Sequence, residues 1–126
     1  MDTRTKIITP EDAAALAHGD RPAVLVTGHF DVLLAAHVRE LVRVRGGLPD
    51  GVLLVALTMP EQPVLDARAR AEMVAALEVV DYVVSLDDQQ MEALLAAFPA
   101  GTVRLEADHE QRRRELIRHV QRRQSG

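Results

Sequence analysis

The sequence predicts a three-layer α/β/α domain built on a parallel sheet of four to five strands. Short, unbroken apolar runs alternate along the chain with longer segments whose apolar residues recur at helical spacing. Runs of this kind, bounded by glycine, proline or polar residues, are typical of strands buried on both faces. Because strands alternating with helices connect through right-handed crossovers, the pattern favours a parallel sheet with helices on both sides, a Rossmann-like arrangement.

The individual elements follow from local signals. Thr9 and Pro10, followed by two acids, favour a helix start, and this short helix should end near Gly19. Strands are expected at 23–27, 52–57, 82–84 and 103–105. Helices are expected near 10–17, 34–45, 65–77 and 91–98 and from about 108 onward.

Composition narrows the class of protein. The chain has 126 residues, enough for one domain, and it has no Cys, so a disulfide framework or a cysteine zinc site is impossible. The first ten residues are polar, and no apolar run approaches the roughly 18 residues of a membrane span. We therefore expect a cytoplasmic protein without a membrane partner.

Charge is distributed unevenly along the chain. Residues 111–126 hold six Arg and one Glu, a charge of +5, which leaves −9 for the other 110 residues of a chain with net charge −4. The basic character is thus local, and with one Tyr, two Phe and no Trp the chain lacks stacking platforms, so nucleic acid is not an expected partner. We expect a single domain over 1–126, with a lead-in helical segment over 1–20 and a basic helix or tail over 108–126.

The turn after the first strand is the strongest candidate site. It places Gly28, His29, Asp31 and His37 within ten residues at the start of a helix. In open parallel sheets ligands bind beyond the carboxyl ends of the strands, and a helix N-terminus presents free N–H groups to a phosphate. A turn glycine beside a solvated histidine is the alternative reading of these residues.

Residues 24–38, VLVTGHFDVLLAAHV, resemble the signature of the cytidylyltransferase-type nucleotidyltransferase superfamily. The family pattern is a strand, Gly-Thr/Cys-Phe-Asp, two residues, and His-x-Gly-His opening a helix. The likeness covers about 22–105 and includes residues 70–84, which resemble the family's Arg-led helix and third strand. The chain is most similar to the adenylyltransferase domain of bacterial ADP-heptose synthase, and next to glycerol-3-phosphate cytidylyltransferase.

The resemblance implies transfer of a nucleotidyl group from ATP or CTP to a sugar phosphate or polyol phosphate, with release of pyrophosphate. It implies Mg²⁺ in an active enzyme, no tightly bound cofactor, and a possible homodimer. It assigns a catalytic role to His37, and nucleotide or phosphate contacts to the following positions: Thr27, Gly28, Phe30, Asp31, Leu34 and Arg70. We add His29 as a second catalytic candidate because of its place in the turn.

The sequence departs from the family pattern within the signature. Leu34 replaces the first motif histidine and cannot donate to a phosphate, and Ala36 replaces the motif glycine. His29 occupies the Thr/Cys position, where it either replaces the lost donor or is a solvated loop residue. After the fourth strand, residues 106–109 replace the family's Gly-Gly/Asp-Asp segment, and no Ser-Thr-Thr helix start follows.

Other polar residues have both a functional and a structural interpretation. Arg70 is either a nucleotide contact or a surface helix arginine, and Asp31 is expected to stabilise the turn. Asp87 and Asp88 could bind a metal, but a helix cap before Met91 is the better reading, and we predict no metal site. The C-terminal arginines could contact phosphates or form a solvated face: Arg112, Arg113, Arg114 and Arg118. The histidines outside the signature are expected to be solvated: His18, His109 and His119.

Three functions therefore remain open at this level. The first is a nucleotidyltransferase whose catalysis is altered by the changes at Leu34 and Ala36. The second is a non-catalytic relative that binds a nucleotide or a phosphorylated ligand, or serves as an assembly partner. The third is a different chemistry on the same fold, which the fold alone does not exclude.

Overall fold

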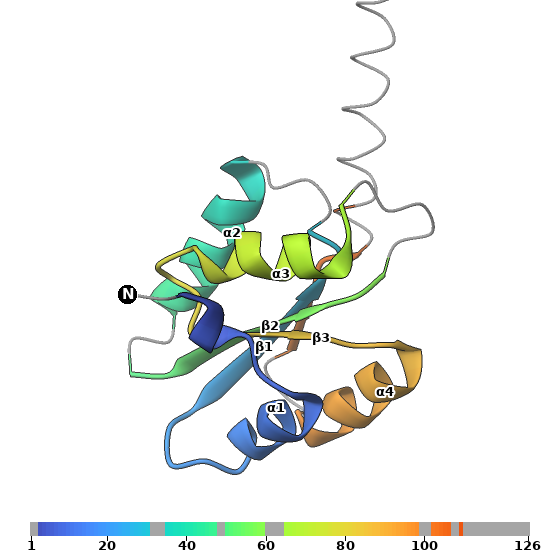
Figure 1. Ribbon diagram of the computed structural model, residues 1–126. Helices are drawn as coiled ribbons and strands as arrows, with labels where there is room; N and C mark the ends of the chain where they lie inside the picture. Colours follow the sequence, from blue (N-terminus) through green and yellow to red (C-terminus); the bar gives the residue numbers. More distant parts are fainter. Residues whose placement is uncertain are drawn as a thin grey trace, which may run out of the picture.

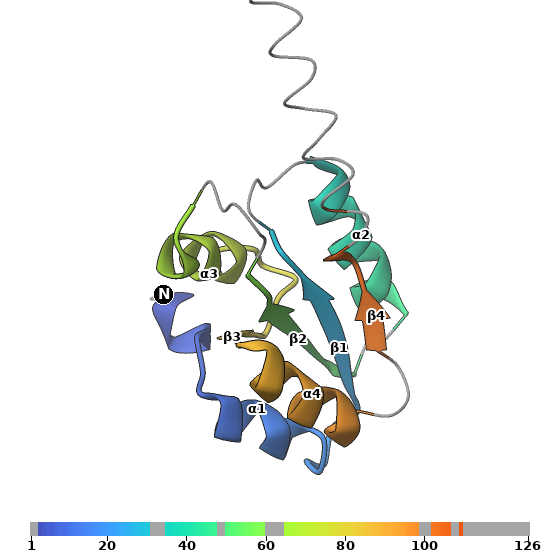
Figure 2. The same ribbon diagram turned by 90° about the vertical axis from the view of Figure 1, so that its right-hand side faces the viewer.

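Among the described residues the sheet has four strands, all parallel to their neighbours, in the order β3-β2-β1-β4 (Figures 1 and 2). This computed structural model describes residues 3–30, 35–47, 50–59, 65–98, 102–106 and 109. The strands are β1 (Ala23–Gly28), β2 (Val52–Leu57), β3 (Tyr82–Ser85) and β4 (Thr102–Arg104). The predicted parallel sheet is confirmed, and the expected strands differ from these by a residue or so at their ends.

Helices cover both faces of the sheet. They are α1 (Pro10–Leu16), α2 (Ala35–Gly46), α3 (Ala67–Ala75) and α4 (Asp88–Ala97). Helices α2 and α3 lie on one face, and α1 and α4 lie on the other (Figures 1 and 2). Along β2, Leu53 and Val55 pack in the first layer, and Leu54 and Ala56 pack in the second. The side-chain alternation of a strand thus gives two aliphatic cores and the three-layer architecture.

The helix starts follow the local signals. The Thr9 hydroxyl accepts a hydrogen bond from the Asp12 amide at 3.1 Å, which caps α1 as predicted. Asp87 and Gln90 form a reciprocal capping box at the start of α4, so the cap reading of this acid is confirmed. Helix α3 begins later than expected because Asp66 takes an extended conformation and caps it through the Ala69 amide.

The lead-in segment protects one edge of the sheet. A short 3₁₀ helix, η1 (Thr3–Lys6), is followed by Ile7, which forms an isolated parallel bridge with Val83. The Ile8 amide donates to the Val83 carbonyl at 2.9 Å. These contacts occupy hydrogen-bonding groups on the open side of β3, which would otherwise be available to another chain.

The strand order determines where a ligand can bind. The chain runs outward from β1 through β2 to β3 and then returns to place β4 on the other side of β1. The reversal makes the carboxyl ends of β1 and β4 the topological switch point, where open α/β sheets bind ligands. His29 and Phe30 follow β1, and Leu105, Glu106 and His109 follow β4, so these residues meet there. Apart from His109, the predicted basic helix or tail over 108–126 lies outside the described residues.

Candidate functional site

Phe30 holds a strained position at the switch point. Its φ is 47°, in the left-handed region, and its side chain is fully buried. A bulky residue in this conformation costs about 1–3 kcal/mol and persists only where its surroundings impose it. The surroundings here are two imidazoles, which meet the Phe30 ring edge-on at centroid distances of 5.8 Å for His37 and 4.3 Å for His109.

His37 lies in the first turn of α2 and is only 3% exposed. Its ring centroid is 4.2 Å from that of His109. The structure therefore places the retained motif histidine in a buried cluster at the carboxyl end of the central strand, not on the solvated surface of the helix.

The prediction that His109 is solvated is wrong. Its side chain is 4% exposed, and the His109 amide donates to the Leu105 carbonyl at 2.8 Å. Its Nδ1 accepts hydrogen bonds from the backbone amides of His29 at 3.2 Å and Phe30 at 3.3 Å. An imidazole that accepts at Nδ1 carries its proton on Nε2 when it is neutral.

Gly28 is required for this packing. A Cβ built on Gly28 would lie 2.7 Å from His109 Nδ1 and 2.8 Å from Phe30 Cε2, closer than real Cβ contacts come. The absence of a side chain at the end of β1 thus lets the imidazole lie directly against the backbone.

Thr27 and Glu106 link the two strand ends. The fully buried Thr27 hydroxyl donates to Glu106 Oε2 at 2.9 Å, and the Leu105 amide donates to the Thr27 carbonyl at 2.7 Å. A hydroxyl has one hydrogen to donate, and that of Thr27 is directed at the carboxylate. In this state Thr27 offers no hydrogen to a phosphate, although its position in the signature implied such a contact.

Arg70 is buried inside the turn, and the surface-arginine reading is wrong. The residue is 2% exposed, and its Nη1 donates to the carbonyls of His29 at 2.9 Å and Thr58 at 2.8 Å. Its Nη2 lies 3.5 Å from the Met59 sulfur. The guanidinium therefore ties the turn after β1 to the segment after β2.

His29 and Arg70 both contact Thr58. The half-buried imidazole places Nδ1 3.0 Å from the Thr58 hydroxyl. The ring packed beside His37 is that of His109. His29 is thus a loop residue that is only partly exposed, and the second imidazole of the cluster comes from the segment after β4.

Several predicted or candidate site residues lie outside the described residues: Asp31, Leu34, Arg112, Arg113, Arg114 and Arg118. His119, expected to be solvated, also lies outside them. Sequence reasoning missed Glu106 and His109 as site residues. The available signal was their position directly after a strand that pairs with the signature strand. Within the described residues, no group of three or more His, Asp or Glu side chains is arranged to hold a metal ion.

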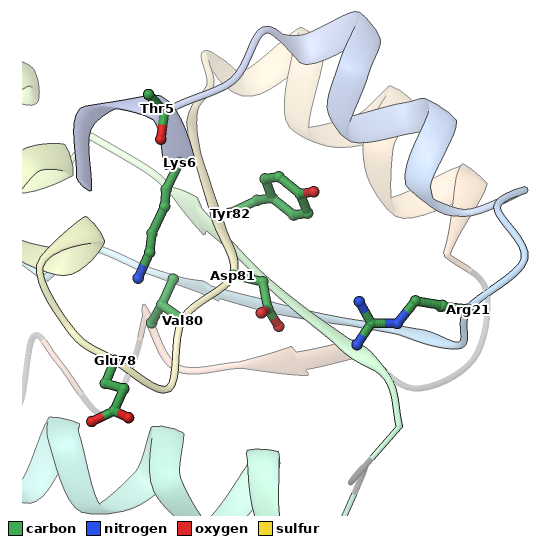
Figure 3. Close-up of a pocket in the computed structure, with 7 residues that line it drawn as sticks. All are labelled: Thr5, Lys6, Arg21, Glu78, Val80, Asp81 and Tyr82. Atoms are coloured by element: carbon green, nitrogen blue, oxygen red, sulfur yellow. The ribbon is translucent and has the colours of Figure 1, made fainter. Parts of the chain in front are cut away.

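A hollow of about 530 Å³ lies elsewhere, near the amino ends of the strands (Figure 3). Three of its charged groups make structural contacts: Lys6 donates to the Leu77 carbonyl, Arg21 donates to the Gly51 carbonyl, and Asp81 pairs with Arg45. The residues around it are Thr5, Lys6, Arg21, Glu78, Val80, Asp81 and Tyr82. Because ligands of this fold bind at the opposite strand ends, we do not assign this hollow as the site.

The fold is that of a Rossmann-like α/β domain, and the sequence after its first strand resembles the signature of nucleotidyltransferase-like proteins. The comparisons with known proteins lead to a particular set of relatives. The chain is 38% identical over 85 residues to the bifunctional protein HldE of Bradyrhizobium diazoefficiens, covering 61% of this chain and 17% of that protein. The HldE proteins of Rhodopseudomonas palustris and Sulfurimonas denitrificans are 34% and 31% identical over 69% and 71% of this chain, and 23% and 20% of their own lengths.

These likenesses confirm the relationship to the cytidylyltransferase-like adenylyltransferase domain that the signature indicated. The chain spans about a fifth of the length of the curated relatives it matches. No protein-family model matches the chain. Among the described residues, no helix combines the length and apolar character needed to cross a membrane.

Proposed function

We propose that this domain binds a nucleotide at the junction of β1 and α2 and supports nucleotidyl transfer only weakly. The observation that carries the proposal is the cluster at the switch point, where His37, His109 and the backbone amides of His29 and Phe30 converge. The relationship to the HldE proteins supports ATP as the nucleotide, with CTP as the alternative, and a sugar phosphate or polyol phosphate as acceptor.

The proposed reaction needs positioning and charge stabilisation more than acid–base chemistry. A phosphate oxygen of the acceptor attacks the α-phosphorus of the nucleotide, and the bond to the leaving pyrophosphate breaks as the new phosphorus–oxygen bond forms. Negative charge develops on the transferring group and the leaving group. Backbone N–H groups at a turn and an imidazole N–H in the first turn of α2 are donors suited to that charge.

The changes within the signature limit catalysis. Leu34 and Ala36 replace the first histidine and the glycine of the family motif. A single donor directed at developing charge is typically worth about 3–4 kcal/mol in the transition state, roughly 100- to 1,000-fold in rate. We therefore expect turnover at least that far below that of a relative with an intact motif.

A non-catalytic binding domain is the second candidate. It is favoured by the Glu106 carboxylate, which lies at the end of β4 and takes the Thr27 hydrogen. A carboxylate at this place opposes the negative charge that would develop on the transferring and leaving groups, and so disfavours transfer. The described residues provide no ready-made protein cage for Mg²⁺, so the ion would bind mainly through phosphate oxygens, as it commonly does.

Calorimetry and a pyrophosphate-release assay test the proposal. Titration with Mg-ATP and Mg-CTP measures binding, and incubation with heptose 1-phosphate or glycerol 3-phosphate measures transfer. His37→Ala should weaken nucleotide binding, whereas His18→Ala, at an exposed position after α1, should leave it unchanged. If the nucleotide binds but no pyrophosphate is released, the non-catalytic candidate is supported. Equal nucleotide affinity in the wild type and the His37 variant, both shown to be folded by circular dichroism, would refute the site.

A further inference from the structure

The backbone amides of His29 and Phe30 already have a partner within the protein. Both N–H groups point to the Nδ1 atom of His109, at 3.2 and 3.3 Å. Two successive amides at a turn between a parallel strand and its helix form a concave donor site that suits an anion. In this structure a neutral nitrogen lone pair fills the place of that anion.

We propose that His109 is an internal ligand of the anion subsite, and that a phosphoryl group binds by displacing its imidazole from the two amides. The inference rests on the proposed function and deepens it, because it names the subsite and the group that competes for it. The ligand class is a phosphoryl oxygen of a nucleotide or of pyrophosphate.

The imidazole and a phosphate cannot occupy the place in front of the two amides at the same time. His109 Nδ1 lies so close to the end of β1 that a single added carbon on Gly28 would collide with the ring. Phe30 and His37 pack against other parts of the same ring. A phosphoryl oxygen therefore cannot reach the two amides until the imidazole leaves.

The attachment of His109 allows such an exchange. The residue follows β4, a strand of three residues at the edge of the sheet, and its amide is bonded to Leu105 in the same segment. The bonds from the two amides are at the long end of the usual range for an N–H donor. Charge-assisted bonds to a phosphate are shorter and about twice as strong, so a ligand can replace them favourably.

A competing internal ligand lowers apparent affinity by the fraction of molecules in which the subsite is open. Removing the imidazole should therefore raise affinity for anions. Two neutral hydrogen bonds of ordinary net strength correspond to roughly tenfold or more in the opening equilibrium. Any variant that keeps an acceptor at the same place should behave like the wild type.

The experiment measures pyrophosphate and Mg-ATP binding by calorimetry in the wild type, His109→Ala and His109→Asn. Asparagine has an acceptor oxygen bonded to Cγ, the atom that carries Nδ1 in histidine, whereas alanine has no side-chain acceptor. We expect about tenfold tighter binding for His109→Ala and little change for His109→Asn. His109→Leu, which keeps bulk but cannot accept, is the second variant in case the alanine variant does not fold.

The outcomes separate this inference from the proposed function. If His109→Ala and His109→Leu bind pyrophosphate or Mg-ATP more tightly than the wild type does, the displacement is supported. It is also supported if these variants bind and the wild type does not. Wild-type binding that is unchanged or weakened in His109→Ala and His109→Leu overturns the displacement while the proposed function stands. If neither the wild type nor any variant binds pyrophosphate or nucleotide, both fall. Nitrogen chemical shifts of His109 in the unliganded protein should report an unprotonated Nδ1, and a protonated Nδ1 would also overturn the inference.

Discussion

The imidazoles of His37 and His109 lie with their ring centroids 4.2 Å apart, at the carboxyl end of the central strand. One comes from the first turn of α2 and the other from the segment after β4. Neither position alone makes a site, but together with the turn amides they form the polar centre of an otherwise aliphatic domain. We therefore expect the glycine, the carboxylate and the arginine around this pair to be sensitive to substitution.

Gly28→Ala should destabilise the fold by about 1–3 kcal/mol, because the added methyl group overpacks the space held by His109 and Phe30. Urea denaturation measures the change in the free energy of unfolding. Gly46→Ala is the matched control, since a Cβ there meets no atom within 4 Å. In the double variant with His109→Ala, part of the loss should be recovered. Equal stability of the Gly28 and Gly46 variants would contradict the packing described here.

Glu106→Gln should raise the affinity for Mg-ATP several-fold. The substitution removes a negative charge at the switch point while a side-chain oxygen still accepts from Thr27. Calorimetry at two salt concentrations measures the effect, which should shrink as salt screens the charge. Glu92→Gln, at an exposed position of α4 on the other face, controls for net charge. A gain of the same size in both variants would rule out a local effect of Glu106.

Arg70→Ala should destabilise the domain by about 2–4 kcal/mol. The variant removes a buried guanidinium that donates to the His29 and Thr58 carbonyls and leaves these acceptors without a donor. Chemical denaturation again measures the loss. Arg68→Ala is the control, because its side chain is 79% exposed and its pair with Glu72 should contribute under about 1 kcal/mol. A loss of stability for Arg70→Ala as small as that for Arg68→Ala would show that Arg70 does not stabilise the turn.

Asp87→Ala should cost about 1 kcal/mol through loss of the cap on α4, and Asp87→Asn should be nearly neutral because the amide oxygen can still accept from Gln90. The midpoint of thermal unfolding compares the two variants under identical conditions. Indistinguishable midpoints for alanine and asparagine would show that the capping box contributes nothing measurable.

Local patterns were sufficient to predict most of the architecture. The run at 52–57 is fully buried in β2, and the caps at Thr9 and Asp87 form as expected, because strand burial and helix capping depend on residues close in sequence. The signature turn was likewise found from its own residues. Helix α3 was predicted to begin too early because a regular apolar spacing does not reveal that Asp66 is its cap.

By itself, the sequence determined the alternation of strands and helices, the parallel sheet and the place of the turn after β1. Only the tertiary structure decided that β4 lies beside β1, and therefore that Glu106 and His109 reach the turn and that Arg70 is buried beneath it. The physical reason is that a histidine after a short strand has the same local pattern whether it faces water or the core. Which of these occurs depends on strand order, which long-range packing sets and neighbouring residues do not encode.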